Sequence, residues 1–144
     1  MDIIKGLEIC TMKIIPHPKG EIMHVLKKTD AVFSDFGEAY FSAVVQNEIK
    51  GWKRHTKMIL NIVVPVGEIC FVFFDDRVGS ETFNQFYTIT VGLENYCRIT
   101  VPPMIWMAFK GVRNDNNLLL NIASIEHDPT ESENKLLSEI PFNW

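Results

Sequence analysis

The stretch GWKRH, residues 51–55, carries the most information about this chain. It stands between two predicted strands, residues 40–45 and 58–64, whose apolar, β-branched and aromatic side chains are typical of extended backbone. Two cations, an imidazole and an indole gathered in one strand-to-strand turn are typical of the rim of a pocket. We therefore expect this turn to place polar side chains at a binding site.

Apolar runs of the same kind recur outward from this stretch, separated by turn signals rich in Gly, Pro, Asn and Asp. About eight short strands with regular turns predict a sandwich, barrel or jelly roll. One short C-terminal helix is also expected, because Thr130 and Glu133 stand at capping-box spacing and Pro141 would end it. The predicted strands cover residues 22–26, 39–45, 59–66, 68–74, 82–91, 96–101, 104–110 and 118–124.

Length and composition limit the class of protein. The 144 residues fit one domain, which we expect to cover residues 1–144, and a hydrophobic content of 47% is enough for a core. A net charge of −4 argues against a nucleic-acid partner, which requires a basic stripe to neutralise phosphates. A small anionic ligand stays possible, because a pocket concentrates a few cations locally.

The sequence also predicts a cytoplasmic protein with no membrane partner. No apolar run approaches the ~18 residues of a transmembrane helix, and the N-terminus lacks the pattern of a signal peptide. The three cysteines are odd in number and unclustered, which favours a reducing compartment over a disulfide framework.

Several motifs, taken in order, resemble one known family. They are GEAYFS at 37–42, KGWKRH at 50–55, VGEI at 66–69, FDDR at 74–77, SETF at 80–83, ITVPP at 99–103, WMAF at 106–109, and the end of the chain from DPTESE at 128–133 to IPFNW at 140–144. Together they resemble the dTDP-4-dehydrorhamnose 3,5-epimerase-like cupins of bacterial surface-sugar biosynthesis. The resemblance implies an all-β cupin, that is a double-stranded β-helix or jelly-roll barrel, which forms a homodimer.

The resemblance also implies a reaction and a base. The family's epimerases use a histidine that removes a proton next to a keto group of a nucleotide-linked sugar, and Lys53 occupies the matching position here. An exposed lysine is a poor base. His55 lies two residues further on, so on extended backbone it faces the same side as Lys53 while Arg54 points outward. In the related ketoisomerases a His-x-His pair occupies these two positions, and His55 matches its second member.

Two further positions depart from the family pattern. Met107 stands where a partner histidine is usual, and a thioether does not transfer protons. The tyrosine that serves as acid in the epimerases has no counterpart in residues 124–129, where Glu126 and His127 offer alternative proton donors. We therefore expect His55, Lys53, Glu126 and His127 to be the catalytic residues.

Four more residues are candidates for substrate binding. Lys50 and Arg54 suit a diphosphate, and Trp52 and Trp106 suit stacking on a sugar or base. For Lys50 and Arg54 an exposed cation at a strand end is an equally ordinary role. For Trp52 and Trp106, aromatic packing in the core or at a dimer interface is the more ordinary role. The motifs do not supply three convergent ligands, so we expect no metal and no cofactor.

Two functional hypotheses follow. The first is a sugar-nucleotide epimerase or isomerase that acts on a nucleotide-linked 4-keto-deoxy sugar, with His55 as base and Lys53 stabilising an enolate-like charge. The second is a catalytically impaired cupin that binds a sugar nucleotide or supports a partner enzyme of the same pathway. The exchanges at Lys53 and Met107 motivate the second hypothesis.

Overall fold

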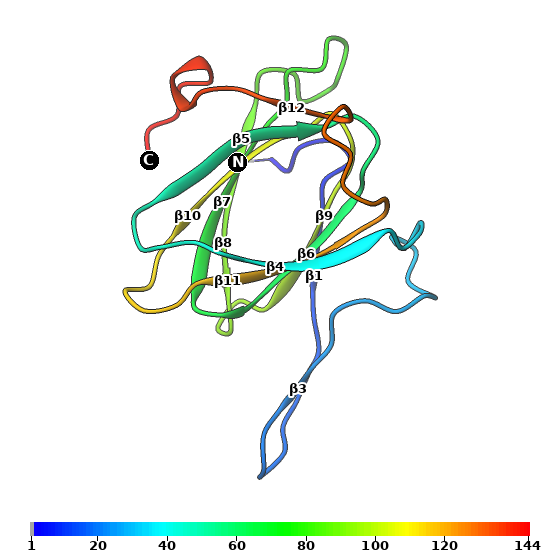
Figure 1. Cartoon of the computed structure of the whole chain (residues 1–144), viewed down its shortest axis with the longest axis vertical. Helices are drawn as coiled ribbons and strands as arrows, with labels where there is room; N and C mark the ends of the chain where they lie inside the picture. Colours follow the sequence, from blue (N-terminus) through cyan, green and yellow to red (C-terminus); the bar gives the residue numbers. More distant parts are fainter. Residues whose placement is uncertain (1) are drawn as a thin grey trace.

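Two antiparallel five-stranded sheets face each other across the interior of the molecule (Figure 1). They belong to a computed structural model that describes residues 2–144. One sheet has the order β1-β9-β6-β11-β4 and the other β12-β5-β10-β7-β8, while β2 and β3 form a separate hairpin. The strands are β1 (Glu8–Thr11), β2 (Ile14–Ile15), β3 (Ile22–Met23), β4 (Glu38–Ala43), β5 (Ile49–His55), β6 (Leu60–Val66), β7 (Glu68–Phe74), β8 (Phe86–Gly92), β9 (Cys97–Val101), β10 (Trp106–Gly111), β11 (Leu118–Ala123) and β12 (Ser132–Asn134).

The core lies between the two sheets, as the alternation of side chains along each strand requires. Ile62 of β6 and Ile99 of β9 come from one sheet, and Phe71 and Phe73 of β7 come from the other; all four are at most 1% exposed. Two sheets closed on one apolar core with antiparallel neighbours make a jelly roll. The predicted all-β jelly-roll fold is therefore confirmed.

Six of the eight predicted strands match observed ones closely, whereas the predicted strand 22–26 is reduced to β3 and a turn replaces strand at residues 82–85, before β8. Strands β1, β2, β5 and β12 were not predicted. A buried carboxylate explains the turn before β8. Asp75 Oδ2 accepts hydrogen bonds from Ser80 Oγ at 2.6 Å and from Thr82 Oγ1 at 2.7 Å, and the Asn84 backbone N–H donates to Asp75 O at 2.7 Å. These local hydrogen bonds hold the loop around Asp75, so β8 begins only at Phe86.

The stretch at residues 51–55 is the end of strand β5 rather than the predicted turn. Apart from Trp52 its residues are not strong strand formers, but β10 pairs with it on one side and β12 on the other. A bulge interrupts the pairing with β10, because Met107 faces Lys53 whereas Phe109 faces Lys50. Two residues of β5 therefore stand opposite Ala108, and the side chains of Lys50 and Lys53 emerge on the same face.

The predicted short C-terminal helix does not begin at Thr130 and is reduced to one 3-10 turn. Strand β12 pairs with β5, with Ser132 opposite His55 and Asn134 opposite Lys53, and the only helical element among residues 2–144 is one 3-10 turn at Leu137–Glu139. The sheet satisfies the backbone hydrogen bonds that a helix would otherwise make. Tertiary pairing therefore overrides the local capping signal.

Glu131, just before β12, fastens this strand to the turn after β5. Its side chain is 4% exposed. Oε2 accepts the backbone N–H groups of Thr56, Lys57 and Met58, each at 3.0 Å, and Oε1 lies 2.5 Å from His55 Nδ1. Burial alone raises the pKa of this carboxyl, but the hydrogen bonds from His55, Met58 and Lys57 outweigh burial and lower the pKa from 4.5 to about 2.

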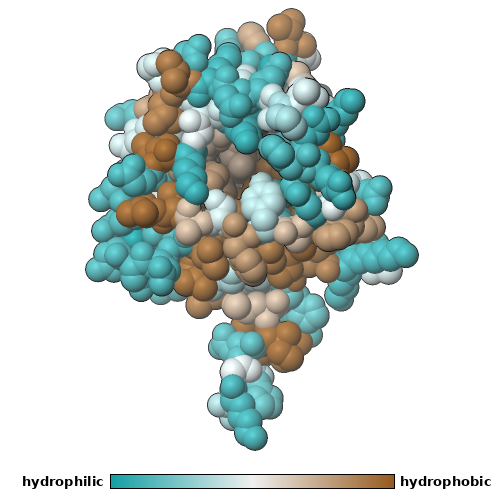
Figure 2. Space-filling model, viewed as in Figure 1, coloured by the Kyte–Doolittle hydropathy of each residue, from teal (hydrophilic) through white to brown (hydrophobic). Residues whose placement is uncertain are grey.

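The β2–β3 hairpin extends away from the two sheets as an arm (Figure 1). Apolar side chains gather on the body where the arm joins it, whereas polar side chains cover the region of β5 and β12 (Figure 2). Ile22 on the arm and Phe41 on β4 are 58% and 63% exposed. No helix within residues 2–144 is long and apolar enough to span a membrane.

The bulge in β5 generates a first prediction, for Gly51→Ala. Gly51 has a φ of +147°, and an added Cβ would lie 2.4 Å from Ala108 Cβ and 2.7 Å from its Cα. We expect the variant to lose about 2–4 kcal/mol of unfolding free energy in urea denaturation, from the clash and the strained φ together. Gly79→Ala is the control, because its φ is +85° but nothing lies within 4 Å; it should lose only about 1–2 kcal/mol. Equal losses would show that the close approach to Ala108 does not matter.

The Glu131 carboxylate generates a second prediction, for stability against pH. A folded-state pKa of about 2, below the ordinary 4.5, adds about 3 kcal/mol of stability above pH 4.5 that is lost as pH falls through 2. Glu131→Gln should therefore be less stable than the natural chain at pH 7, and the difference should shrink steadily between pH 4.5 and 2. Glu126→Gln is the matched control, because Glu126 is exposed, and it should change the stability by less than about 0.5 kcal/mol. A difference that stays constant with pH would contradict the assignment.

Candidate functional site

A cavity of about 250 Å³ opens inside the barrel, between the two sheets. Strands β5, β10 and β12 supply one wall, and β4, β6 and β11 supply the other. Figure 1 shows β4 and β5 diverging on either side of this interior. The lining residues are Tyr40, Ser42, Lys50, Gly51, Lys53, His55, Leu60, Ile62, Met107, Phe109, Leu119, Asn121 and Asn134.

The two lysines of β5 differ in what holds them. Lys50 Nζ donates to Ala43 O at 2.6 Å and to Ser42 Oγ at 3.2 Å, so it ties β5 to β4 at one end of the cavity. Lys53 is exposed, and its ammonium makes no hydrogen bond or ion pair with any residue in the 2–144 range. Lys53 is therefore the cation in the cavity that is available to a ligand.

His55 is the one imidazole among the described residues that line the cavity, and imidazole is the side chain most often used for acid–base chemistry. Its side chain is 13% exposed, and its Nδ1 faces Glu131 Oε1. A carboxylate with a pKa of about 2 is ionised and accepts only, so Nδ1 carries the proton in neutral His55. Nε2 then has an unshared electron pair for a group in the cavity. Carboxylate–histidine pairs of this kind fix both tautomer and ring orientation.

The wall opposite His55 presents a phenol. Tyr40 of β4 and Asn121 of β11 are paired residues in the sheet, and Asn121 Nδ2 donates to the Tyr40 hydroxyl oxygen at 3.0 Å. Asn121 is 1% exposed, and its Oδ1 has no hydrogen-bond partner within the described part of the chain. The observed contact of the Asn121 amide is therefore the one that Nδ2 makes with the Tyr40 hydroxyl.

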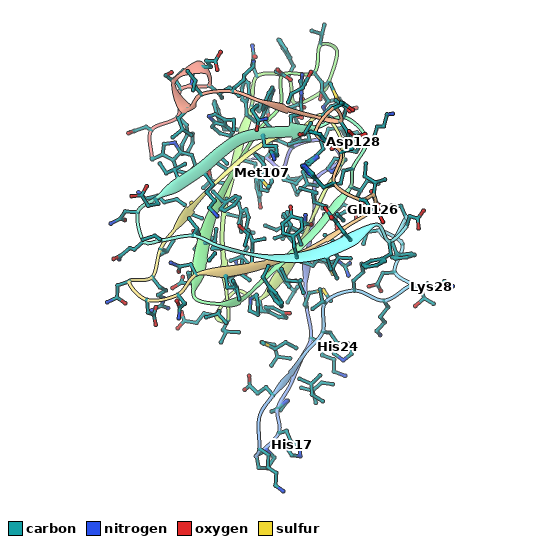
Figure 3. The ribbon with its side chains drawn as sticks, in the orientation of Figure 1. His17, His24, Lys28, Met107, Glu126 and Asp128 are labelled. Atoms are coloured by element: carbon teal, nitrogen blue, oxygen red, sulfur yellow. The ribbon has the colours of Figure 1, made fainter. Side chains whose placement is uncertain are left out.

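Apolar side chains complete the walls of the cavity. Leu60, Ile62 and Leu119 line it from one sheet, and Met107 and Phe109 line it from β10. Figure 3 shows Met107 in the interior, between the sheets. The cavity therefore combines a few polar groups with largely apolar walls, which is the usual composition of a small-molecule site.

Three of the predicted binding residues lie outside the cavity, on the other face of the β5–β10 sheet. The Arg54 guanidinium contacts Asp76 Oδ1 at 2.7 Å and lies 4.6 Å above the Trp106 ring. Trp52 donates from Nε1 to Ile140 O at 3.2 Å. Both tryptophans are 1% exposed. The structure therefore places Arg54, Trp52 and Trp106 in packing against the C-terminal segment.

Two of the predicted catalytic residues also lie away from the cavity. Glu126 and His127 are exposed and do not line it. Figure 3 shows Glu126 and Asp128 on the loop between β11 and β12, at the side of the barrel. Of the eight residues singled out in the sequence, the structure brings Lys50, Lys53 and His55 together.

Sequence reasoning missed Glu131, Tyr40 and Asn121. Glu131 stands in the segment that resembled a capping box, which drew attention to helix formation instead of to a carboxylate partner for His55. Tyr40 and Asn121 stand on strands whose pairing the sequence did not specify. Alternation along β4 was the one available signal, because it separates Tyr40 and Ser42 from Phe41.

No group of three or more His, Cys, Asp and Glu side chains among residues 2–144 is placed to hold a metal ion.

Comparison with known proteins gives the chain its relatives. No family model matches it. The crystal structure of a dTDP sugar isomerase from Desulfovibrio desulfuricans G20 superposes with a TM-score of 0.93 at 35% identity, over 98% of this chain and 92% of that one. The dTDP-4-dehydrorhamnose 3,5-epimerase of Sulfolobus tokodaii superposes with a TM-score of 0.86 at 19% identity, over 100% and 84% of the two chains, which shows the shared fold.

A curated relative agrees with these structures. The probable low-salt glycan biosynthesis epimerase Agl13 of Haloferax volcanii is 25% identical over 145 residues, which are 99% of this chain and 91% of the relative. The resemblance expected from the sequence motifs is confirmed: this chain belongs to the family of dTDP-sugar isomerases and epimerases.

Proposed function

We propose that this protein is a sugar-nucleotide epimerase or isomerase that acts on a nucleotide-linked 4-keto-deoxy sugar of surface-glycan biosynthesis. The observation that carries the proposal is the His55–Glu131 pair at the wall of the cavity, beside the unpaired ammonium of Lys53. The relatives support the substrate class, because they include a dTDP sugar isomerase and a glycan biosynthesis epimerase.

His55 is the base of the proposed reaction. Its Nε2 removes a proton from the carbon next to the keto group, and the electrons of that C–H bond move to the keto oxygen as an enolate. Glu131 stabilises the imidazolium that forms, because its ionised carboxylate stays hydrogen-bonded to Nδ1. Base catalysis of this kind contributes about 10²–10⁴-fold to a rate.

Lys53 stabilises the enolate oxygen in this scheme. Its ammonium lies on the same face of β5 as His55 and has no partner within residues 2–144. A cation aimed at an oxygen that gains charge only in the transition state lowers the barrier. Lys53, which occupies the position of the family's usual histidine base, then stabilises charge instead of transferring a proton.

The size of the cavity sets how the substrate is placed. A volume of about 250 Å³ lies below the ~300–1,000 Å³ that encloses a drug-sized ligand. The sugar ring therefore enters the cavity, with the apolar walls around its deoxy carbon, and the nucleotide stays at the mouth.

A second candidate function is a binding protein without turnover. The exchanges at Lys53 and Met107 favour it, because neither an ammonium nor a thioether replaces a histidine base. In this case sugar nucleotides raise the melting temperature but undergo no reaction.

A third prediction separates the two functions. The protein is incubated in deuterated water with dTDP- and GDP-linked 4-keto-6-deoxy sugars, and deuterium next to the keto group is measured by NMR and mass spectrometry. We expect incorporation by the natural chain and a loss of at least about 100-fold in the His55→Asn variant. His127→Asn is the matched control and should keep full exchange, since His127 does not line the cavity. Thermal stabilisation without any exchange would support the binding protein instead.

We also propose a homodimer, formed through the outer face of β4 and the arm. Alternation along β4 points Phe41 away from the cavity, and its 63% exposure leaves a large aromatic in solvent. With the apolar band at the root of the arm (Figure 2), it makes a surface that suits a second copy of the chain.

A fourth prediction concerns this dimer. Sedimentation velocity should give the natural chain twice the monomer mass of 16.6 kDa, and Phe41→Asp should shift it toward the monomer because a buried charge is costly at an interface. Val78→Asp is the control: Val78 is 93% exposed, on the loop after β7, and the substitution should leave the mass unchanged. A natural chain that runs as a monomer would contradict the proposal.

A cytoplasmic location completes the proposal. Cys10, Cys70 and Cys97 are free thiols, which suits a reducing compartment.

A further inference from the structure

We infer that Tyr40 is the acid that returns the proton to the sugar, and that Asn121 is its positioning residue. The inference rests on the proposed function and adds the group that completes the reaction. Tyr40 takes the role of proton donor that the sequence assigned to Glu126 and His127, which are exposed and do not line the cavity.

The alignment of β4 against β5 places Tyr40 across from the base. Lys50 Nζ is bonded to Ser42 Oγ, which fixes where the two strands meet. The strands run in opposite directions from the short connection at residues 44–48. Tyr40 is therefore one inward-facing position beyond Ser42, just as Lys53 is the next inward-facing residue beyond Lys50. The phenol and the base strand consequently line opposite walls of one cavity.

The contact with Asn121 leaves the phenol free to donate. Asn121 Nδ2 gives its proton to the Tyr40 oxygen at 3.0 Å, so this contact uses the oxygen as an acceptor and leaves the O–H proton for a ligand. The same contact stabilises negative charge on the oxygen after that proton leaves. Asn121 is buried and lies opposite Tyr40 in the sheet register, so the phenol is oriented before the substrate enters.

The proton balance of the reaction closes with these two groups. His55 Nε2 takes the proton from the carbon, and the C–H electrons form the enolate. The enolate carbon then takes the proton of the Tyr40 O–H from the opposite face, the keto group reforms, and the configuration inverts. Imidazolium and phenolate remain, and one proton passes through water from His55 to Tyr40 to restore both.

Among residues 2–144, no other proton donor that lines the cavity is placed to protonate the face of the enolate opposite His55. Lys53 lies on the same strand and wall as His55, so its proton returns to the side from which the first one left. Ser42 is engaged by Lys50, and an aliphatic hydroxyl is a far weaker acid than a phenol with a pKa of ~10.

The test separates exchange from inversion in deuterated water. With Tyr40→Phe we expect the base still to form the enolate, so deuterium enters next to the keto group at a rate within about tenfold of the natural chain. Formation of the inverted sugar should fall at least about 100-fold. Asn121→Leu, which keeps the volume but removes the donor, should lower the ratio of inversion to exchange while leaving exchange in place. A purely structural role would lower both together.

Controls keep the outcomes distinct. Tyr87→Phe changes a tyrosine of β8 that packs against the core outside the cavity, and it should keep the natural ratio. Melting temperatures with added dTDP establish that each variant is folded. Inversion by Tyr40→Phe at the natural rate would overturn the role of Tyr40 while leaving the proposed function standing. Exchange lost in parallel with inversion in both variants would also overturn it. Absence of exchange by the natural chain would overturn both proposals.

Discussion

The carboxylate of Glu131 is the constraint on which the rest of the site depends. One oxygen binds three consecutive backbone N–H groups after β5, and the other binds the imidazole of His55. The same residue introduces β12, which pairs with β5 along His55 and Lys53. A single ionised group thus positions the His55 imidazole and holds the start of β12 against the turn after β5. Its low pKa has the same origin as its structural role.

The bulge in β5 is the second constraint, and it decides which cations reach the cavity. Without the extra residue, Lys50 and Lys53 would point to opposite faces, since an odd spacing on a regular strand separates them. With it, Lys50 joins β5 to β4 and Lys53 projects into the cavity, while Trp52 and Arg54 pack outside. In the proposed reaction, this arrangement gives Lys53 an electrostatic role and leaves proton transfer to His55.

The sequence predicted the fold well because strand periodicity and turn residues are local signals. It predicted the shared face of Lys53 and His55 for the same reason. Strands β1 and β2 were missed as well as β5 and β12. In β5 and β12 most residues are polar or charged, and pairing with neighbouring strands supplies the stabilisation. Tyr40, Asn121 and Glu131 were missed because their roles arise from contacts between residues 76 or more apart. Glu126 and His127 were chosen because they lie in the segment where the family's tyrosine was expected. The local sequence does not show whether side chains on a loop face the cavity or the solvent.

The most direct test of the account is the tautomer of His55, measured by two-dimensional ¹⁵N–¹H NMR of the imidazole nitrogens at neutral pH. The account predicts a protonated Nδ1 held by Glu131 and an unprotonated Nε2 whose chemical shift changes when a dTDP-linked sugar is added. In Glu131→Gln the preference for this tautomer should be lost. A proton on Nε2 in the natural chain would contradict the claim that His55 is the base. An Nε2 chemical shift that does not change when the sugar nucleotide is added would contradict it as well.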